Sequence, residues 1–255
     1  MKKGYPLGLR TLQVLVVGGL LAIWEIAGRA GWVSPVFFPT PWAIFKLTVE
    51  LFRTGELTAH LGATLSRMIG GFLLGGVIGV LIGLPMGWSA PIRRFLDPFV
   101  ASVHAIPKIS LLPLIMIVIG IGEAPKLVII GLASFFPMVI NSLAGVQQIS
   151  PLYCEVARNY GAGSWGILRK VILPGSLPMI FAGIRLAFNS ALVLTIAVEL
   201  VTADTGLGAL IWTAWETFRI GALYAAVFIT ALLGVLFNFV LGRIARWAIP
   251  WQPPA

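Results

Sequence analysis

The chain has 255 residues, of which 58% are hydrophobic and 11% are charged, and its formal net charge is +9. Soluble domains carry roughly 25% charged residues, so this composition excludes a solvated globular domain and indicates a membrane protein. The length suits about six spanning helices of about 20 residues each, and the scattered basic residues favour a topology signal over a nucleic-acid partner.

The first residues, Met1-Lys-Lys-Gly-Tyr-Pro, precede a long apolar run without a small-residue cleavage site. We therefore expect a retained first helix, not a removed signal peptide. Six apolar segments follow along the chain, at residues 11–28, 64–87, 99–121, 126–146, 177–201 and 222–245.

The distribution of Lys and Arg residues predicts the orientation of these segments. With the N-terminus inside, ten basic residues fall on the cytoplasmic side: Lys2, Lys3, Arg10, Arg93, Arg94, Arg158, Arg169, Lys170, Arg243 and Arg246. Five fall on the outer side: Arg29, Lys46, Arg53, Lys126 and Arg219. Because cytoplasmic loops carry the excess of positive charge, we expect both termini in the cytoplasm.

Residues 30–60 form the longest outer connection. The X-Pro steps at residues 34–41 resist helix formation. A helix from Pro41 to Phe52 is predicted after them, with Thr40 as its N-cap and Pro41 in its first position. This helix is amphipathic, so we expect it to lie at the outer interface of the membrane.

The second apolar segment carries a glycine every four residues, at Gly71, Gly75, Gly79, Gly83 and Gly87. Helices in lipid associate through close backbone approach at small residues, so this ridge predicts a helix buried against its neighbours. Two interpretations stay open, namely static packing and a helix that slides during gating.

The third apolar segment contains Pro107 and Pro113, each of which removes a backbone hydrogen bond and bends a helix. Irregular backbone at membrane depth persists only where protein or a water-filled cavity covers it. The segment is therefore either a pathway wall or a helix with two ordinary kinks. Lys108 either faces a cavity, where its cation would help an anion to pass, or extends to the cytoplasmic side.

Further polar side chains lie within the fourth and fifth segments, where ionisable groups are candidates for function. Asn141 is either a pathway group or a helix–helix hydrogen bond. Arg185 and Asn189 lie one helical turn apart, and we expect Arg185 to extend to the inner interface. Glu199 either lines an outer gate or extends to the outer interface. The predicted pathway residues are Lys108, Asn141, Asn189 and Glu199.

Several other polar residues are not predicted to line the pathway. Arg67, His60 and Glu25 lie near segment ends and are expected at the membrane interface. His104 has no partner at metal-ligand spacing, so no metal site is predicted. Cys154 is the single cysteine, which excludes an intrachain disulfide and a cysteine zinc site.

A polar, cationic stretch separates the fourth and fifth apolar segments. Ser150 suits the N-cap of a short helix, and Gly161 suits the left-handed position that ends it. Glu155 is expected near the positive N-terminal end of that helix. A second short helix is predicted to begin at Ser164 and to stop before Pro174.

The spacing in this stretch resembles the EAA loop of ABC-importer permeases, which reads Glu-Ala-Ala, three residues, Gly, nine residues and Ile-x-Leu-Pro. The positions that fit are Glu155, Ala157, Gly161, Leu173 and Pro174, whereas Val156 and Val171 replace Ala and Ile. Further stretches look like permeases for nitrate, sulfonate, taurine and bicarbonate: Ile106-Pro107, Leu112-Pro113-Leu114, Gly206-Leu207-Gly208, Tyr224-Ala-Ala, Leu232-Leu-Gly and Asn238.

The resemblance implies an all-α, polytopic membrane protein with six transmembrane helices and the type I importer (MetI-like) permease fold. Residues 1–60 would hold the N-terminal helix and the outer connection, residues 61–248 a five-helix core with the coupling loop 150–174, and residues 249–255 a tail. The implied ATPase-coupling residues are Glu155, Val156, Ala157, Arg158, Asn159, Tyr160, Gly161 and Ala162.

The resemblance also implies partners. These are two cytosolic ABC ATPase subunits, an extracytoplasmic solute-binding protein and a second permease subunit, at the lipid bilayer of the inner (plasma) membrane. The second permease is either another copy of this chain or a paralogue, and we expect a homodimer. The implied function is import of a small oxyanion such as nitrate, sulfonate, taurine or bicarbonate by alternating access.

The sequence contains no phosphate loop, no His-Glu-x-x-His and no Gly-x-Ser-x-Gly, so no catalytic residue or cofactor is assigned. A membrane enzyme acting on lipids would lack the acid–base clusters that such chemistry needs. The main alternative is an ion-coupled secondary transporter acting alone, with Glu199, Glu25 or Lys108 as its coupling group. Such folds often contain internal repeats, and none is evident here.

Overall fold

The computed structural model describes residues 7–251, which form helices and turns and, within that range, no strand. The helices are α1 (Leu7–Arg29), α2 (Pro41–Arg53), α3 (Glu56–Trp88), α4 (Ala90–Ala105), α5 (Leu112–Ile119), α6 (Glu123–Gln147), α7 (Pro151–Asn159), α8 (Ser164–Ile167), α9 (Leu173–Thr202), α10 (Leu207–Glu216) and α11 (Ile220–Ala248). A 3-10 turn at Lys108–Leu111 precedes α5, and a π-helical turn at Leu168–Ile172 joins α8 to α9. The predicted all-α class is confirmed.

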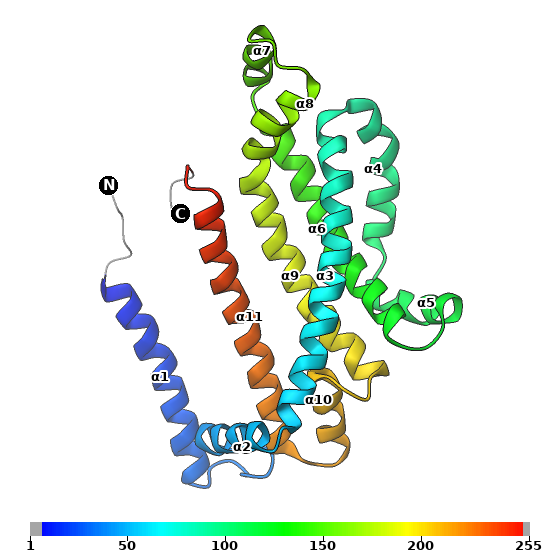
Figure 1. Cartoon of the computed structure of the whole chain (residues 1–255). Helices are drawn as coiled ribbons and strands as arrows, with labels where there is room; N and C mark the ends of the chain where they lie inside the picture. Colours follow the sequence, from blue (N-terminus) through cyan, green and yellow to red (C-terminus); the bar gives the residue numbers. More distant parts are fainter. Residues whose placement is uncertain (1–6, 252–255) are drawn as a thin grey trace.

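Within the described range, five helical segments are long and apolar enough to cross a membrane, and the bent pair of α4 and α5 makes a sixth. The long helices α3, α6, α9 and α11 run along the molecule, α2 lies across one end, and α7 lies at the other (Figure 1). We call these the α2 end and the α7 end. The six predicted apolar segments correspond in order to α1, α3, α4 with α5, α6, α9 and α11.

The third apolar segment is broken, so of its two interpretations the one of a helix with two ordinary kinks was wrong. Helix α4 stops at Ala105, Ile106 is extended with ψ 131°, and the chain turns by 90° before α5. The residue before a proline is disfavoured in the α region, so the break falls directly before Pro107. Pro113 lies in the first turn of α5, where its missing N–H costs nothing.

The glycine ridge of α3 is the surface that packs against α6, as the sequence predicted. A Cβ atom on Gly75 would overlap the backbone of Gly131 in α6, and one on Gly79 would lie 2.7 Å from the carbonyl oxygen of Phe135. Non-bonded atoms normally stand about 3.5–4.0 Å apart. The two helices are therefore in backbone contact, which only glycine permits.

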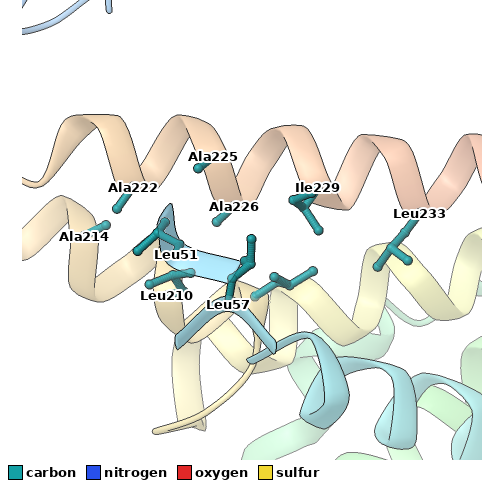
Figure 2. Close-up of a cluster of buried hydrophobic side chains, with 10 residues drawn as sticks. Leu51, Leu57, Leu210, Ala214, Ala222, Ala225, Ala226, Ile229 and Leu233 are labelled. Atoms are coloured by element: carbon teal, nitrogen blue, oxygen red, sulfur yellow. The ribbon is translucent and has the colours of Figure 1, made fainter. Parts of the chain in front are cut away.

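A second contact region lies at the α2 end, where a cluster of buried side chains joins α2, α3, α10 and α11 (Figure 2). Leu51 of α2, Leu57 of α3 and Leu210 of α10 pack with Ala226 and Ile229 of α11. Leu57 is completely buried. This cluster fixes α2 against the core of the protein.

Helix α2 begins as the sequence predicted. The hydroxyl of Thr40 accepts a hydrogen bond from the N–H of Ala43 at 3.3 Å, and Pro41 is in the first turn. Trp42 and Phe45 on its other face are 50% and 52% exposed. The helix is thus amphipathic, with one face on the core and an aromatic face free for the membrane interface.

The second helix of the polar stretch does not stop before Pro174, and that prediction was wrong. Ser164 begins it, but the helical path continues through the π turn and α9 to Thr202. A π turn widens the helix directly before Pro174, which accommodates a ring that would otherwise clash with the carbonyl four residues earlier.

Candidate functional site

The α7–α8 hairpin, residues 150–174, projects at the α7 end of the molecule (Figure 1). No residue of α7 is buried. Three aromatic side chains are largely exposed: Tyr160 at 89%, Trp165 at 72% and Tyr153 at 65%. Aromatic residues are enriched in the cores of protein–protein interfaces, and exposed apolar patches mark interaction sites. The hairpin therefore offers a docking surface for another protein.

The opposite face of the hairpin fixes it to the bundle. Ile167 and Ile172 are buried together with Val146 at the end of α6, and Cys154 and Ala157 of α7 pack against them. The exposed aromatic side chains thus sit on a backbone that is anchored to two spanning helices. A force applied to the hairpin would reach α6 and α9 directly.

Gly161 ends α7 in the left-handed conformation, with φ +81°, as the sequence predicted. Its N–H donates to the carbonyl of Arg158 at 2.8 Å, and the N–H of Ala162 donates to the carbonyl of Ala157 at 2.9 Å. A Cβ atom at Gly161 would meet no heavy atom within 4 Å. The backbone conformation favours glycine here, while the space around it is open.

Two details of the hairpin differ from the prediction. Ser150 occupies the N-cap position, but its side chain makes no capping hydrogen bond. Glu155 is the fifth residue of α7, whose first turn contains no acidic residue. The expected interaction of Glu155 with the helix N-terminus was wrong, because that effect falls off within the first turn. Glu155 is exposed on the hairpin.

A cavity of about 460 Å³ lies between the α4–α5 break, α6 and α9. Its lining comes from the middle of the spanning helices, since Pro137 is near the centre of α6 and Asn189 near the centre of α9. Lys108, directly after the break, lines the same cavity. Two of the four predicted pathway residues, Lys108 and Asn189, are therefore brought together.

The other two predicted pathway residues do not line this cavity. The side-chain amide of Asn141 donates to the carbonyl of Pro137 at 2.8 Å, and Asn141 packs where Gly183 of α9 lacks a side chain. The hydrogen bond of Asn141 thus stays within α6, and only its side-chain packing reaches α9, so the predicted helix–helix hydrogen bond is not formed among the described residues. Glu199 lies in a separate polar cluster.

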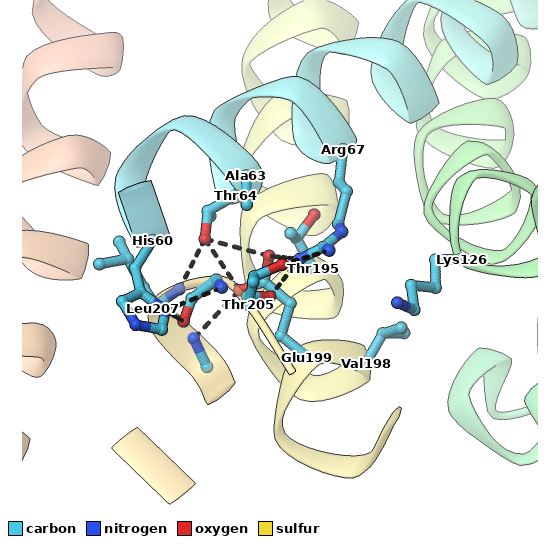
Figure 3. A network of polar contacts seen from close by, with 12 residues as sticks. His60, Ala63, Thr64, Arg67, Lys126, Thr195, Val198, Glu199, Thr205 and Leu207 are labelled. Carbon is cyan, nitrogen blue, oxygen red and sulfur yellow. Dashed lines mark hydrogen bonds and ion pairs between the residues drawn. The ribbon is translucent and has the colours of Figure 1, made fainter. Parts of the chain in front are cut away.

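That cluster lies near the α2 end, where Glu199 is completely buried (Figure 3). Its carboxylate accepts hydrogen bonds from the hydroxyl of Thr64 at 2.8 Å, from Nη1 of Arg67 at 2.9 Å and from the N–H of Gly208 at 3.0 Å. The hydroxyl of Thr64 accepts from the N–H of Leu207 at 2.8 Å. A buried charge without such partners would cost several kcal/mol.

Arg67 connects this carboxylate to α6. Its Nε and Nη2 bind the two carboxylate oxygens of Glu123 at 2.7 and 2.9 Å, a bidentate arrangement. Nζ of Lys126 lies 2.9 Å from the same carboxylate. Arg67 also donates to the carbonyl and the hydroxyl of Thr205. The positive charges of Arg67 and Lys126 thus balance the negative charges of Glu123 and Glu199. The contacts of these side chains tie α3, α6 and α9 to the loop before α10.

The stretch Gly206-Leu207-Gly208 makes room for Glu199. Gly206 has φ +123°, and a Cβ atom there would overlap the Glu199 carboxylate. A Cβ atom on Gly208 would lie 2.6 Å from the Cβ of Glu199. Both glycines are required by close approach, which gives this motif a structural explanation.

The sequence did not predict this cluster. Arg67 was expected at the interface but is 6% exposed, and His60 accepts a hydrogen bond from the N–H of Gly206 at 3.0 Å. The interpretation that Glu199 extends to the outer interface was also wrong. One feature of the sequence could have indicated the cluster, namely an arginine, Arg67, inside an apolar segment. Its acidic partners could not be identified, because they depend on how α3, α6 and α9 pack.

Comparison with known proteins adds independent findings. The family model described as "Binding-protein-dependent transport system inner membrane component" matches residues 75–252. The chain is 30% identical over 258 residues to the taurine transport system permease protein TauC of Escherichia coli (strain K12), across 99% of this chain and 94% of that protein.

A second relative is the putative aliphatic sulfonates transport permease protein SsuC of Bacillus subtilis (strain 168), 32% identical over 239 residues, across 94% of this chain and 87% of that protein. Among solved structures, a chain of the inward-facing MetNI methionine ABC transporter matches with a TM-score of 0.61 at 22% identity. That match covers 71% of this chain and 93% of the other, and it shows a shared fold.

Proposed function

Since the chain belongs to the family of binding-protein-dependent transport system inner membrane components and is the permease subunit of an ABC importer, we propose that it moves a small oxyanion into the cytoplasm. Alternating access would be driven by ATP hydrolysis in a separate subunit, because the sequence contains no phosphate loop. The observation that carries the proposal is the exposed, anchored hairpin at the α7 end.

The ATPase would bind the first half of this hairpin. The contacting residues in this proposal are Glu155, Val156, Ala157, Arg158, Asn159, Tyr160, Gly161 and Ala162. All of them are exposed except Ala157 and Ala162, which are half-buried against the bundle. Movement of the ATPase would then be transmitted through the buried residues under the hairpin to α6 and α9.

The proposed assembly contains two permease copies, two ATPase subunits and an extracytoplasmic solute-binding protein. Helix α4 has no buried residue, and Phe95 and Phe99 on it are 69% and 61% exposed. Ile117 and Val118 of α5 are 81% and 82% exposed. These apolar surfaces support a second copy and lipid as neighbours of this half of the chain.

The proposed orientation places the α7 end in the cytoplasm. Helix α1 leads from that side to α2, and α11 returns toward it (Figure 1). The α7 end carries Arg93 and Arg94 after α3, and the basic residues of the hairpin. This agrees with the excess of positive charge expected on the cytoplasmic side, and both termini would be cytoplasmic.

The cargo in this proposal is a small organic oxyanion, since the named relatives carry taurine and aliphatic sulfonates. Lys108 and Asn189 would line its path, because they share the open cavity beside the α4–α5 break, α6 and α9. Asn141 and Glu199 would shape the path indirectly, Asn141 through its packing against Gly183 of α9 and Glu199 through its ion pair with Arg67 of α3.

Reconstitution tests the proposal. The permease, its ATPase and its binding protein would be placed in liposomes with labelled taurine or ethanesulfonate outside. We expect uptake that requires both ATP and the binding protein. Uptake by the permease alone, without ATP, would instead establish an ion-coupled secondary transporter.

A further inference from the structure

We propose that the cavity between the α4–α5 break, α6 and α9 contains an anion subsite in which Lys108, Asn189 and Ser190 bind the oxyanion head of the cargo. The inference rests on the proposed function and adds the residues that would recognise the charge. Its starting point is the cavity of about 460 Å³ that these three residues line.

Lys108 carries a positive charge that the described part of the chain does not neutralise. Its Nζ donates to the carbonyl of His104 at 2.5 Å and lies 5.1 Å from the centre of the Phe136 ring. No ion pair with a carboxylate is formed among the described residues, whereas Arg67 and Lys126 in the same bundle both bind Glu123. Lys108 thus differs from these two cations in having no carboxylate partner among the described residues.

An unpaired cation at membrane depth is costly and marks a substrate or ion pathway. An ammonium group has three N–H donors. The carbonyl of His104 accepts one, and Nδ1 of His104 lies 3.4 Å away, at the limit of a second bond. At least one donor therefore remains for a group in the cavity, and an anion would also lower the cost of the charge.

Asn189 and Ser190 supply neutral donors next to this charge. Oδ1 of Asn189 accepts a hydrogen bond from the side chain of Asn238 at 3.1 Å, which leaves the amide N–H groups of Asn189 as donors for a ligand. The hydroxyl of Ser190 makes no hydrogen bond within residues 7–251. Charge-assisted hydrogen bonds to an oxyanion are stronger than neutral ones.

The rest of the cavity wall is apolar and selects the kind of anion. Ala133, Pro137, Val193 and Leu194 face the same space. A few placed polar groups in an apolar pocket suit a ligand with one charged head and a short organic body. The subsite thus fits an organic sulfonate or carboxylate better than a fully hydrated inorganic ion.

The test compares Lys108→Gln, Lys108→Arg and Lys46→Gln in the full complex with ATPase and binding protein, reconstituted in liposomes. Lys46 is the matched control, because its Nζ also lies over an aromatic ring, 5.5 Å from that of Trp42, but outside the cavity. The readouts are initial uptake of labelled ethanesulfonate and binding-protein-stimulated ATP hydrolysis.

We expect Lys108→Gln to lower uptake roughly tenfold or more, as for loss of a hydrogen bond to a charged group, while ATP hydrolysis stays near the wild-type rate. Lys108→Arg keeps the charge and should retain most uptake, and Lys46→Gln should behave as wild type. Ser190→Ala, a milder change, should lower uptake by roughly two- to tenfold.

Two results would overturn the subsite. One is wild-type uptake by Lys108→Gln. The other is equal loss of uptake and ATP hydrolysis in both Lys108 variants, which would indicate a structural role. A wild-type complex that assembles but does not import the sulfonate would refute the proposed cargo itself, and the subsite with it.

Discussion

Replacing Gly75 with alanine tests the backbone contact between α3 and α6. The new Cβ would overlap the carbonyl oxygen of Gly131 and lie 2.5 Å from its carbonyl carbon and 2.8 Å from its Cα. Normal carbon–carbon contacts are about 3.5–4.0 Å, so the helices would have to separate by roughly 1 Å. Backbone atoms cannot rotate away as a side chain can.

The magnitude follows from two opposing effects. Overpacking costs about 1–3 kcal/mol, and the upper end applies because backbone is in the way. Alanine returns about 1 kcal/mol of helix propensity. The expected net loss in the free energy of unfolding is therefore about 2 kcal/mol.

The matched control is Gly62→Ala, on the same helix, where a Cβ atom would meet nothing within 4 Å. Thermal unfolding of the purified chain in detergent, followed by tryptophan fluorescence, would compare the two variants with wild type. We expect a lower unfolding temperature for Gly75→Ala and an equal or higher one for Gly62→Ala. If Gly75→Ala unfolds at the temperature of Gly62→Ala, the contact between α3 and α6 is looser than the structure indicates.

Three further predictions concern other parts of the chain. Glu199→Ala should destabilise the protein by about 3–5 kcal/mol, because it leaves buried Arg67 without one partner. The control Glu216→Ala, at an exposed position, should leave the unfolding temperature unchanged. Equal shifts of the unfolding temperature in the two variants would contradict the burial of the cluster. Tyr160→Asp, at an 89% exposed position, should leave the unfolding temperature unchanged but lower ATP hydrolysis by the complex, and unaltered hydrolysis would argue against docking at this face. Thr40→Ala should lower the stability of the first turn of α2 by about 1 kcal/mol. The measurement is amide hydrogen exchange at Ala43, whose N–H binds the Thr40 hydroxyl and should exchange faster in the variant. Unchanged exchange at Ala43 would rule out the cap.

Much of the fold could be predicted because its determinants are local. Apolar segments of spanning length report the number of helices, and the four-residue glycine period reports which face of α3 packs closely. The turn at Gly161 and the cap at Thr40 each depend on a few neighbouring residues. These features need no knowledge of what lies across the bundle.

The remaining features depend on contacts between distant segments. Glu199 and Arg67 are 132 residues apart in sequence and meet at 2.9 Å, so neither residue alone indicates that both are buried. The continuation of the helix through Pro174 depends on a π turn that no local propensity predicts. Likewise, Lys108 and Asn189 share a cavity only because the chain breaks before Pro107.

We propose that an ATPase binds this permease through the α7–α8 hairpin. The most direct measurement is mass determination of the complex purified gently from its native membranes, for wild type and for Gly161→Trp. The bulky side chain would enter open space, and the left-handed backbone would cost only about 1–2 kcal/mol, so the permease itself should still insert and fold. We predict two permeases with two ATPase chains for wild type, and loss of the ATPase chains for Gly161→Trp. A variant that keeps its ATPase chains and imports normally, or a wild-type chain that purifies alone and transports without ATP, would contradict the claim.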